Sequence, residues 1–196
     1  MHTYTGIRRM MKRIQVFVFS ALAIVPMFAN AAIWTFEGGM NTEQSAATHA
    51  LALPDPYFGG GIVFAALDTE TGEFSWEFTY AGLSGAPGAA HFHEAPAGVA
   101  GGVTVPVTVP ATISGAGSGS VILAGGGLAD AISALTGDGG FGPGAITDWY
   151  LNIHTPANGA GELRGQLFVA AVVPVPAALW LAVPALGLLM RRRRFR

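Results

Sequence analysis

Two histidines stand two residues apart in the segment "AAHFHEAP", residues 89–96. In a β-strand alternate side chains point to the same face, so His91 and His93 would share one face and Phe92 would take the other. A His-x-His pair on a strand, joined by a distant third histidine, is a spacing that suits zinc or copper. His154, in "DWYLNIHT", is the candidate third ligand. The sequence therefore offers His91, His93 and His154 as a metal site.

A structural role for the same histidines is the alternative. The segments "DWYLNIHT" and "GELRGQL" also alternate apolar and polar side chains, as half-buried strands do. Their polar positions and the two histidines above form one candidate cluster: His91, His93, Tyr150, Asn152, His154, Glu162, Arg164 and Gln166. A hydrogen-bonded network of this kind can brace strands if every member is satisfied. Because such clusters are often structural, we favour bracing and expect no cofactor, with copper or zinc as the alternative.

Charge is distributed unevenly along the chain. Between Ala32 and Val173 there is one base, Arg164, against twelve acids, a formal charge of −11. So acidic a surface repels nucleic acid, which we exclude as a partner, whereas cations and basic partners remain compatible. The planar guanidinium of Arg164 suits a bidentate bond to a carboxylate, and Glu94 and Glu162 are the candidates.

Other catalytic patterns are weak. The chain has no cysteine, and no serine lies in a G-x-S-x-G turn. "GAGSGS" and "GGG" lack the lysine of a P-loop, and we interpret them as turns. We interpret His49 as a solvated surface residue. Carbohydrate binding through Trp76 or Trp149 is a weaker alternative, since the spacing of Trp76 places it in the core. We therefore expect no enzyme and no catalytic residue.

Short apolar runs separated by glycine and proline predict an all-β sandwich or barrel. In "EFSWEFTY", four aromatic residues from Phe74 to Tyr80 alternate with polar ones, which predicts a strand with an inward aromatic face. The turn "TGE" joins this strand to one over Ile62–Leu67. "VTVPVTVP" predicts an edge strand, because proline cannot donate to a strand partner.

The second half of the domain is predicted from similar signals. "SVILA" is a further strand, and "GLADAISALTG" has Leu128, Ile132 and Leu135 at helical spacing, with Gly137 closing one short helix. "DWYLNIHT" and "GELRGQLFVA" are the last two strands, and "PANGAG" between them predicts a hairpin.

Both ends of the chain carry targeting patterns. Basic residues, the apolar run Ile14–Phe28 and an Ala-x-Ala site at residues 29–31 predict a secretory signal. From Ala170 to Met190 there are 21 apolar or small residues. At about 1.5 Å per residue they just cover a hydrocarbon core of about 30 Å. The arginines that follow predict a cytoplasmic end and a type I topology.

These patterns divide the chain into five parts. We expect a signal peptide over residues 1–31, a β domain over 32–170, a linker and sorting motif over 171–176, a hydrophobic membrane segment over 177–190, and a basic cytoplasmic tail over 191–196.

The segments "AAHFHEAPAG" and "YLNIHTPANGAGELRGQL" resemble the CHRD domain, first described in chordin and widespread in exported bacterial proteins. The resemblance covers about Ile62 to Leu167. The matching positions are His91, His93, Tyr150, Asn152, His154, Thr155, Gly161, Glu162, Arg164, Gly165 and Gln166. It implies an immunoglobulin-like, Greek-key sandwich or barrel and no settled activity; in chordin the domain belongs to an extracellular binding protein.

The tail is similar to a PEP-CTERM sorting signal of the V-P-x-P-A type. The matching residues are Val173, Pro174, Val175, Pro176, Arg191, Arg192, Arg193 and Arg194, with the apolar stretch between them. This resemblance implies recognition by an exosortase, cleavage near Pro174–Pro176, and a Gram-negative host that makes exopolysaccharide.

These expectations describe an exported, non-enzymatic CHRD protein with a structural or binding role. It would sit in the inner membrane before processing and then at the cell surface or in the matrix. Its expected partners are signal peptidase, exosortase, and exopolysaccharide or surface proteins. The alternative is a copper- or zinc-binding periplasmic or extracellular protein, or a superoxide-dismutase-like enzyme. Four histidines and no disulfide between Ala32 and Val173 are too few for the two-metal site of that enzyme family.

Overall fold

A computed structural model describes residues 31–54 and 57–174. The predicted signal peptide except Ala31, the membrane segment and the arginine tail lie outside the described residues, as does the second half of the sorting motif. Within the described part of the chain, no helix has the length and apolar character needed to cross a membrane.

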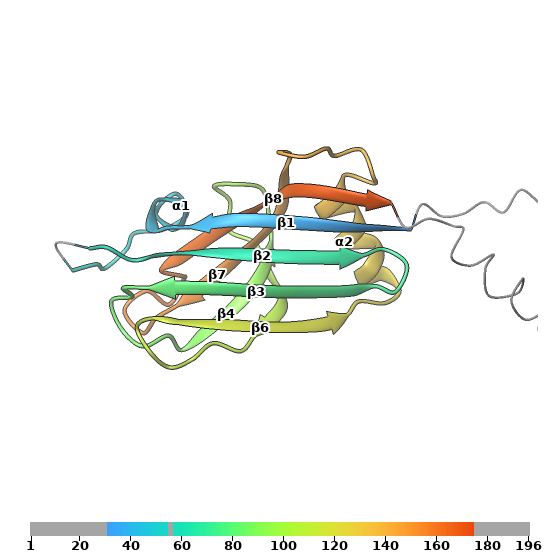
Figure 1. The fold of residues 1–196 in the computed structure, drawn as a ribbon. Coiled ribbons are helices and arrows are strands. Elements are labelled where there is room, and N and C mark those ends of the chain that lie inside the picture. The colour runs from blue at the N-terminus through green and yellow to red at the C-terminus, as the bar shows by residue number, and fades with distance from the viewer. Residues whose placement is uncertain (1–30, 55–56, 175–196) are drawn as a thin grey trace, which may run out of the picture.

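Eight antiparallel strands form one sheet in the order β5-β4-β7-β8-β1-β2-β3-β6. The strands are β1 (Ala32–Met40), β2 (Gly60–Asp68), β3 (Glu73–Ala81), β4 (Ala89–Glu94), β5 (Gly102–Val107), β6 (Gly115–Ile122), β7 (Ile146–His154) and β8 (Leu163–Pro174). Figure 1 shows β1, β2, β3 and β6 side by side, with β4 and β7 crossing behind them. The sheet curls on itself into a nearly closed barrel, which confirms the predicted all-β class.

Strand β8 joins the two layers. Its first half pairs with β7 and its second half with β1, where Ala32 lies opposite Pro174. The hairpin between β7 and β8 agrees with the one predicted from "PANGAG". The sheet thus places β7 beside β4, the strand that carries the His-x-His pair.

An aromatic core lies between the layers. In β3, Phe74, Phe78 and Tyr80 are buried and Trp76 packs against the core, as the alternation in "EFSWEFTY" predicts. Phe74 meets Phe92 and Trp149 of the rear layer edge to face, at ring-centroid distances of 5.0 and 5.1 Å. These contacts fix β3 over β4 and β7.

Two helices complete the domain. Helix α1 (Thr42–Ala46) follows β1, and neither element is among those predicted from the sequence. Helix α2 (Gly126–Thr136) links β6 to β7 and buries Ala131 and Leu135. It ends at Gly137, whose left-handed φ of 57° closes the helix as predicted.

The interpretation of "GAGSGS" as a turn is wrong, because these residues form most of β6. A Cβ on Gly117 would lie 2.5 Å from the Phe78 ring, and one on Gly119 would lie 2.7 Å from the Trp76 ring. Glycine therefore lets large β3 side chains pack beneath the neighbouring strand. The predicted edge strand is confirmed: β5 contains Pro106 and, among the described strands, pairs with β4 alone.

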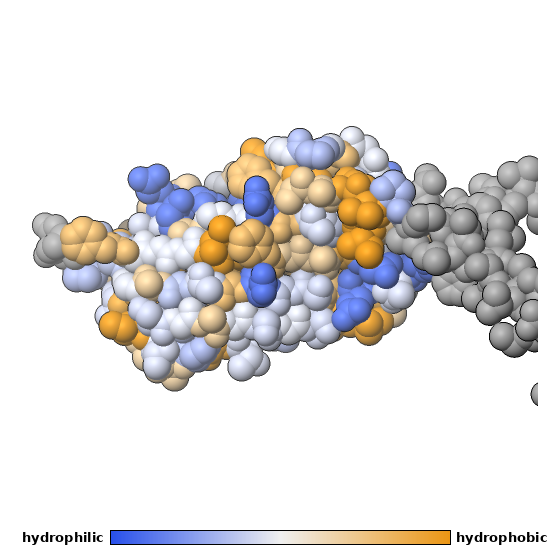
Figure 2. Space-filling view, in the orientation of Figure 1, coloured by the Kyte–Doolittle hydropathy of each residue, from blue (hydrophilic) through white to orange (hydrophobic). Residues whose placement is uncertain are grey.

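The outer surface of the front layer mixes residue types. Figure 2, in the orientation of Figure 1, shows hydrophobic and hydrophilic residues side by side over the middle of these strands. Isoleucine and phenylalanine of β2 contribute to this surface, since Ile62 and Phe64 are each 40% exposed.

Candidate metal centre

The register of β4 and β7 brings three histidines together. His91 lies opposite Asn152 and His93 opposite Tyr150, while His154 lies two residues beyond Asn152 on the same face of β7. The intervening residues Phe92 and Ile153 belong to the core instead. Period-two alternation on two neighbouring strands is therefore sufficient to gather the imidazoles.

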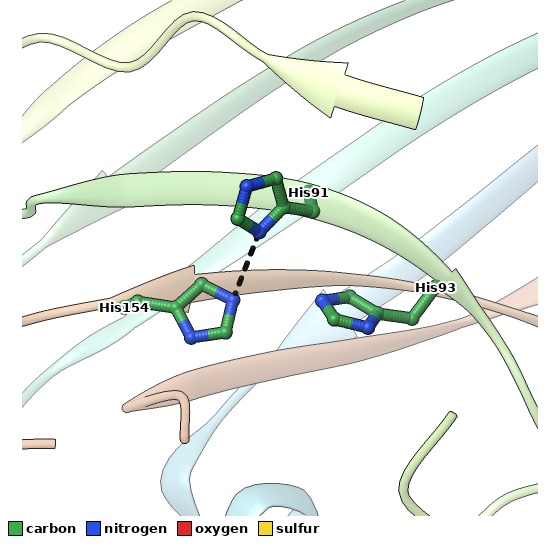
Figure 3. Close-up of side chains that lie close together, drawn as sticks. All are labelled: His91, His93 and His154. Carbon is green, nitrogen blue, oxygen red and sulfur yellow. Dashed lines mark hydrogen bonds between the residues drawn. The ribbon is translucent and has the colours of Figure 1, made fainter. Parts of the chain in front are cut away.

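The three rings point toward one another (Figure 3). His91 Nδ1 lies 3.2 Å from His154 Nε2. One nitrogen from each of His91, His93 and His154 lies within 4.8 Å of the other two. Bonds of 2.0–2.1 Å from a tetrahedral metal would separate two ligand nitrogens by about 3.3 Å. One pair is already at that spacing, and the third nitrogen would need to approach by roughly 1.5 Å at most.

The tautomers of two rings follow from their hydrogen bonds. His93 Nδ1 donates to the carbonyl oxygen of Gly101 at 3.0 Å, and His154 Nδ1 donates to that of Gly159 at 3.0 Å. A carbonyl can only accept, so each Nδ1 carries the proton and each Nε2 carries a lone pair. Metal-binding histidines are oriented in this way by backbone carbonyls.

His93 Nε2 has no hydrogen-bond partner among the described residues, although it is buried. The whole side chain is 7% exposed. A buried polar atom without a partner costs about 1–3 kcal/mol, and it calls for an explanation. His91 and His154 satisfy each other, so the unmatched acceptor in the group is His93 Nε2.

Electrostatics keep the three imidazoles neutral. Burial lowers the pKa of His91, His93 and His154 below the ordinary value of 6.5. For His93 the bond to Gly101 opposes this lowering of the pKa, and the charges of His91 and Arg164 add to it. A neutral ring keeps one nitrogen lone pair for a metal ion. At His91, the proton that Nδ1 donates to His154 Nε2 would have to move to Nε2 before Nδ1 could bind a metal.

Comparison with known protein families matches residues 41–167 to the CHRD domain. The chain belongs to the CHRD domain family. This confirms the resemblance found in the sequence. The match contains all three histidines and every other member of the candidate polar cluster. No curated protein and no solved structure matches the chain.

In this CHRD domain Arg164 supports the histidines through a stack of side chains. Its Cζ atom lies 3.5 Å from the centroid of the Tyr150 ring. The His93 ring also stacks on Tyr150, with 5.1 Å between the ring centroids and 9° between the ring planes. Tyr150 Oη also accepts from the backbone N–H of Gly101, at 2.9 Å. The stack and the Gly101 carbonyl together fix the orientation of the His93 ring.

The predicted bond from Arg164 to Glu94 or Glu162 is wrong. Arg164 donates to the carbonyl oxygens of Val99 and Pro96, at 2.7 and 3.0 Å, and to Gln166 Oε1 at 2.7 Å. The guanidinium thus holds the loop between β4 and β5, which carries Gly101. Glu94 accepts from Trp149 Nε1, at 3.1 Å, and is not free for this role.

Glu162 forms a second polar centre of the CHRD domain, apart from the histidines. Its carboxylate accepts from Tyr57 Oη at 2.8 Å and from the Ser84 N–H at 2.6 Å. It also accepts from the Ser84 hydroxyl, from Thr155 Oγ1 at 2.7 Å and from Asn158 Nδ2 at 2.9 Å. Burial by itself would raise the pKa of Glu162, but these hydrogen bonds to the ionised form outweigh it and the pKa is lowered.

Sequence reasoning did not find the partners of Glu162. Ser84, Asn158 and Tyr57 lie in three loops, where no periodicity marks a buried side chain. Thr155 is the exception, since it belongs to the family pattern. The sequence did contain one signal for these partners. A buried carboxylate needs hydrogen-bond donors, and with a single arginine in the domain most of them must be hydroxyl, amide or backbone N–H groups.

The remaining predicted residues occupy structural positions. Asn152 Nδ2 donates to the Ala160 carbonyl at 3.0 Å, and Gln166 Nε2 donates to the Thr147 carbonyl at 2.6 Å. His49 is not a solvated residue, because it is half-buried and its Nε2 lies 2.7 Å from the Gly161 carbonyl. Trp149 is fully buried, which removes it as a carbohydrate platform.

Proposed function

We propose that this CHRD protein binds one copper or zinc ion through His91 Nδ1, His93 Nε2 and His154 Nε2. The observation that carries the proposal is the buried, unpartnered Nε2 of His93, directed toward the other two rings. A bracing network would satisfy each polar atom. Asn152 Oδ1 and Arg164 Nε are also buried without a partner, but His93 differs in that one of its ring nitrogens lies within 4.8 Å of a nitrogen of both His91 and His154.

The donor set favours copper or zinc over hard cations. Three imidazole nitrogens form the cluster, and no carboxylate among the described residues joins it. Calcium and magnesium take oxygen ligands, whereas imidazole suits zinc and copper. Three protein ligands leave a fourth position for water or another small ligand, on the side where His91 and His154 are only half-buried.

We propose a site for a single ion and not the two-metal centre of superoxide-dismutase-like enzymes. The cluster has three histidines, and His49 is held by the Gly161 carbonyl and Thr48 instead. The proposed role is binding of the ion without turnover.

Export and surface sorting form the other part of the proposal. The N-terminal signal pattern and the V-P-x-P-A tail support processing by signal peptidase and by exosortase, with passage through the inner membrane. The pairing of Ala32 with Pro174 is compatible with this route, because it brings the first residue of β1 and the last residue of β8 side by side. Exopolysaccharide or surface proteins are the proposed surroundings of the mature protein.

Titration of the metal-free protein with Cu²⁺ or Zn²⁺, followed by calorimetry, tests the site. We expect one ion per chain, and loss of binding in His91→Ala, His93→Ala and His154→Ala. His49→Ala is the matched control, since it removes a half-buried histidine outside the trio. Undiminished binding in all three folded variants, or no binding by the parent protein, would rule the site out.

Cell fractionation tests export. Expressed in a Gram-negative host with an exosortase, the full chain should yield a surface or extracellular form whose N-terminus lies near Ala32. Replacing Arg191–Arg194 by serine should reduce the amount of this processed surface or extracellular form. An unprocessed cytoplasmic protein in both cases would contradict the proposed route while leaving the metal site untouched.

A further inference from the structure

Strand β6 is an edge of the sheet that the preceding segment covers only in part: the Thr108 carbonyl oxygen and Pro110 lie within 3.3 Å of the positions that a Cβ on Gly117 and on Gly115 would take. It pairs with β3 on one side, and no backbone hydrogen bond of the described residues reaches its other side. Its eight residues, Gly115–Ile122, include no charge and no proline. Edge strands are normally blunted by charged side chains or proline, as Pro106 does for β5 at the opposite edge.

The outward-facing side chains over most of this edge strand are small. Ala116, Ser118 and Ser120 face outward from β6, because Gly117 and Gly119 face the rings beneath. On β2, two strands away, Ile62 and Phe64 stand much higher. This step leaves a shallow hollow of about 360 Å³ over β3, with Glu77 and Thr79 in its lining.

A cross-strand row places acids on both sides of an exposed aromatic ring. Glu37 of β1 lies opposite Phe64, Phe64 lies opposite Glu77, and Glu77 lies opposite Ser118. Directly opposite side chains are about 5 Å apart at Cβ. The mixed hydrophobic and hydrophilic surface over these strands is the one seen in Figure 2. A cationic side chain could lay its stem on Phe64 and its charged end by a carboxylate.

Nothing in the described domain neutralises this surface. Its single base, Arg164, is buried in the rear layer at 2% exposure. The segment from Ala32 to Val173 carries a formal charge of −11. A second copy of the domain would therefore be repelled, whereas a basic segment would be attracted.

We propose that the free edge of β6 binds an extended, lysine- or arginine-bearing segment of a partner protein, which adds to the sheet as a ninth strand. Main-chain hydrogen bonds to β6 supply affinity, and alternate side chains supply specificity. The added strand lies about 10 Å from β3, two strand spacings away. Its basic side chains cross the small residues Ala116 and Ser118 to reach Glu77. This surface is separate from the three histidines and does not depend on the proposed metal ion.

The probe is an eight-residue peptide that alternates lysine and valine, labelled for fluorescence anisotropy and added to the full-length protein. One face of such a strand carries lysines for Glu77, and the other carries valines. We expect saturable binding that weakens as salt is raised, because the charged pairs are exposed. A glutamate–valine peptide should not bind, and a peptide with a central proline should bind far more weakly.

Two variants separate the surface from general charge attraction. Glu77→Gln should weaken binding of the lysine–valine peptide by about two- to fivefold, the range for an exposed ion pair. Glu70→Gln is the matched control, because it removes the same charge from the turn between β2 and β3. Equal weakening in both variants would mean that only net charge attracts the peptide, and the site would be rejected.

Amide hydrogen exchange tests the ninth strand directly. On addition of the peptide, amides of residues 115–122 should gain protection while those of β5 should not. Binding without protection of β6 overturns strand addition. Protection of β6 without any peptide, accompanied by dimers in sedimentation, identifies a second copy as the occupant and also overturns the proposal.

Discussion

The two polar centres of this CHRD domain differ in how completely their hydrogen bonds are satisfied. Glu162 accepts five hydrogen bonds from four residues of the surrounding loops. The histidine cluster is partnered on its outer side, at Gly101 and Gly159, but His93 Nε2 has no partner. A closed network is built to hold loops together, and an open one is suited to receive a ligand.

The largest effect is expected from a substitution that breaks the closed hydrogen-bond network around Glu162. Glu162→Ala removes the acceptor of the Ser84 N–H, of the Ser84 and Thr155 hydroxyls and of one Asn158 Nδ2 bond, although Asn158 keeps its bond to the Ala52 carbonyl. The free energy of unfolding should therefore fall by roughly 3–5 kcal/mol. Urea denaturation measures this loss. Glu94→Ala, which removes a carboxylate with a single bond to Trp149, should cost about 1 kcal/mol. Similar losses of unfolding free energy in the two variants would show that the network around Glu162 does not contribute more stability than a single hydrogen bond.

The next largest effect is expected when a metal ion binds the three histidines. At a free Zn²⁺ or Cu²⁺ concentration 100-fold above the dissociation constant, the folded domain should gain about 2.7 kcal/mol of stability. Thermal unfolding with and without metal measures the gain, which should vanish in His154→Ala and persist in His49→Ala. An equal gain in His154→Ala would place the ion elsewhere on this acidic protein.

Acid should weaken the two centres in different pH windows. The pKa of Glu162 is lowered in the folded state, so its stabilisation is present above about pH 4.5 and is lost as the pH falls further. The pKa values of the histidines are also lowered, so the unfolded chain takes up their protons first. Their penalty is absent above about pH 6.5 and grows as the pH falls below that value.

Urea denaturation of the metal-free protein between pH 8 and 4 resolves these windows. The decline in stability between about pH 6.5 and 5 should shrink in His91→Gln, while the decline below about pH 4.5 should remain. A parent protein whose stability is constant from pH 7 to 5 would contradict the lowered histidine pKa values.

The smallest expected effect separates stability from binding at one residue. His93→Phe keeps the stack on Tyr150, loses the bond to Gly101 and removes the unpartnered Nε2. These changes nearly cancel, so the metal-free variant should stay within about 1 kcal/mol of the parent. Metal binding should nevertheless be lost in the calorimeter. A loss of several kcal/mol with binding intact would make His93 a brace after all.

Much of the fold could be predicted because local patterns agree with tertiary burial. The aromatic alternation of Phe74 to Tyr80, the helix closed by Gly137 and the proline-bearing edge strand each depend on nearby residues. The gathering of His91, His93 and His154 also follows from alternation once β4 and β7 pair.

The rest depends on contacts that no local pattern encodes. The glycines of β6 resemble a turn until the rings of Trp76 and Phe78 are placed beneath them. Charge complementarity predicted that Arg164 would bind a carboxylate, but its guanidinium donates to backbone carbonyls of the loop between β4 and β5 instead. His49 appeared solvated because its partner, Gly161, lies 112 residues further along the chain.

The position of β8 determines how the domain would carry mechanical load. The chain leaves the described domain at Pro174, at the end of a strand that lies inside the sheet between β7 and β1. Hydrogen bonds between strands run across the strand direction. A pull along β8 therefore stretches many of them at once, as in a lap joint under shear, and does not peel them one by one. A force applied at Pro174 along β8 should therefore meet more resistance than one applied across the strand.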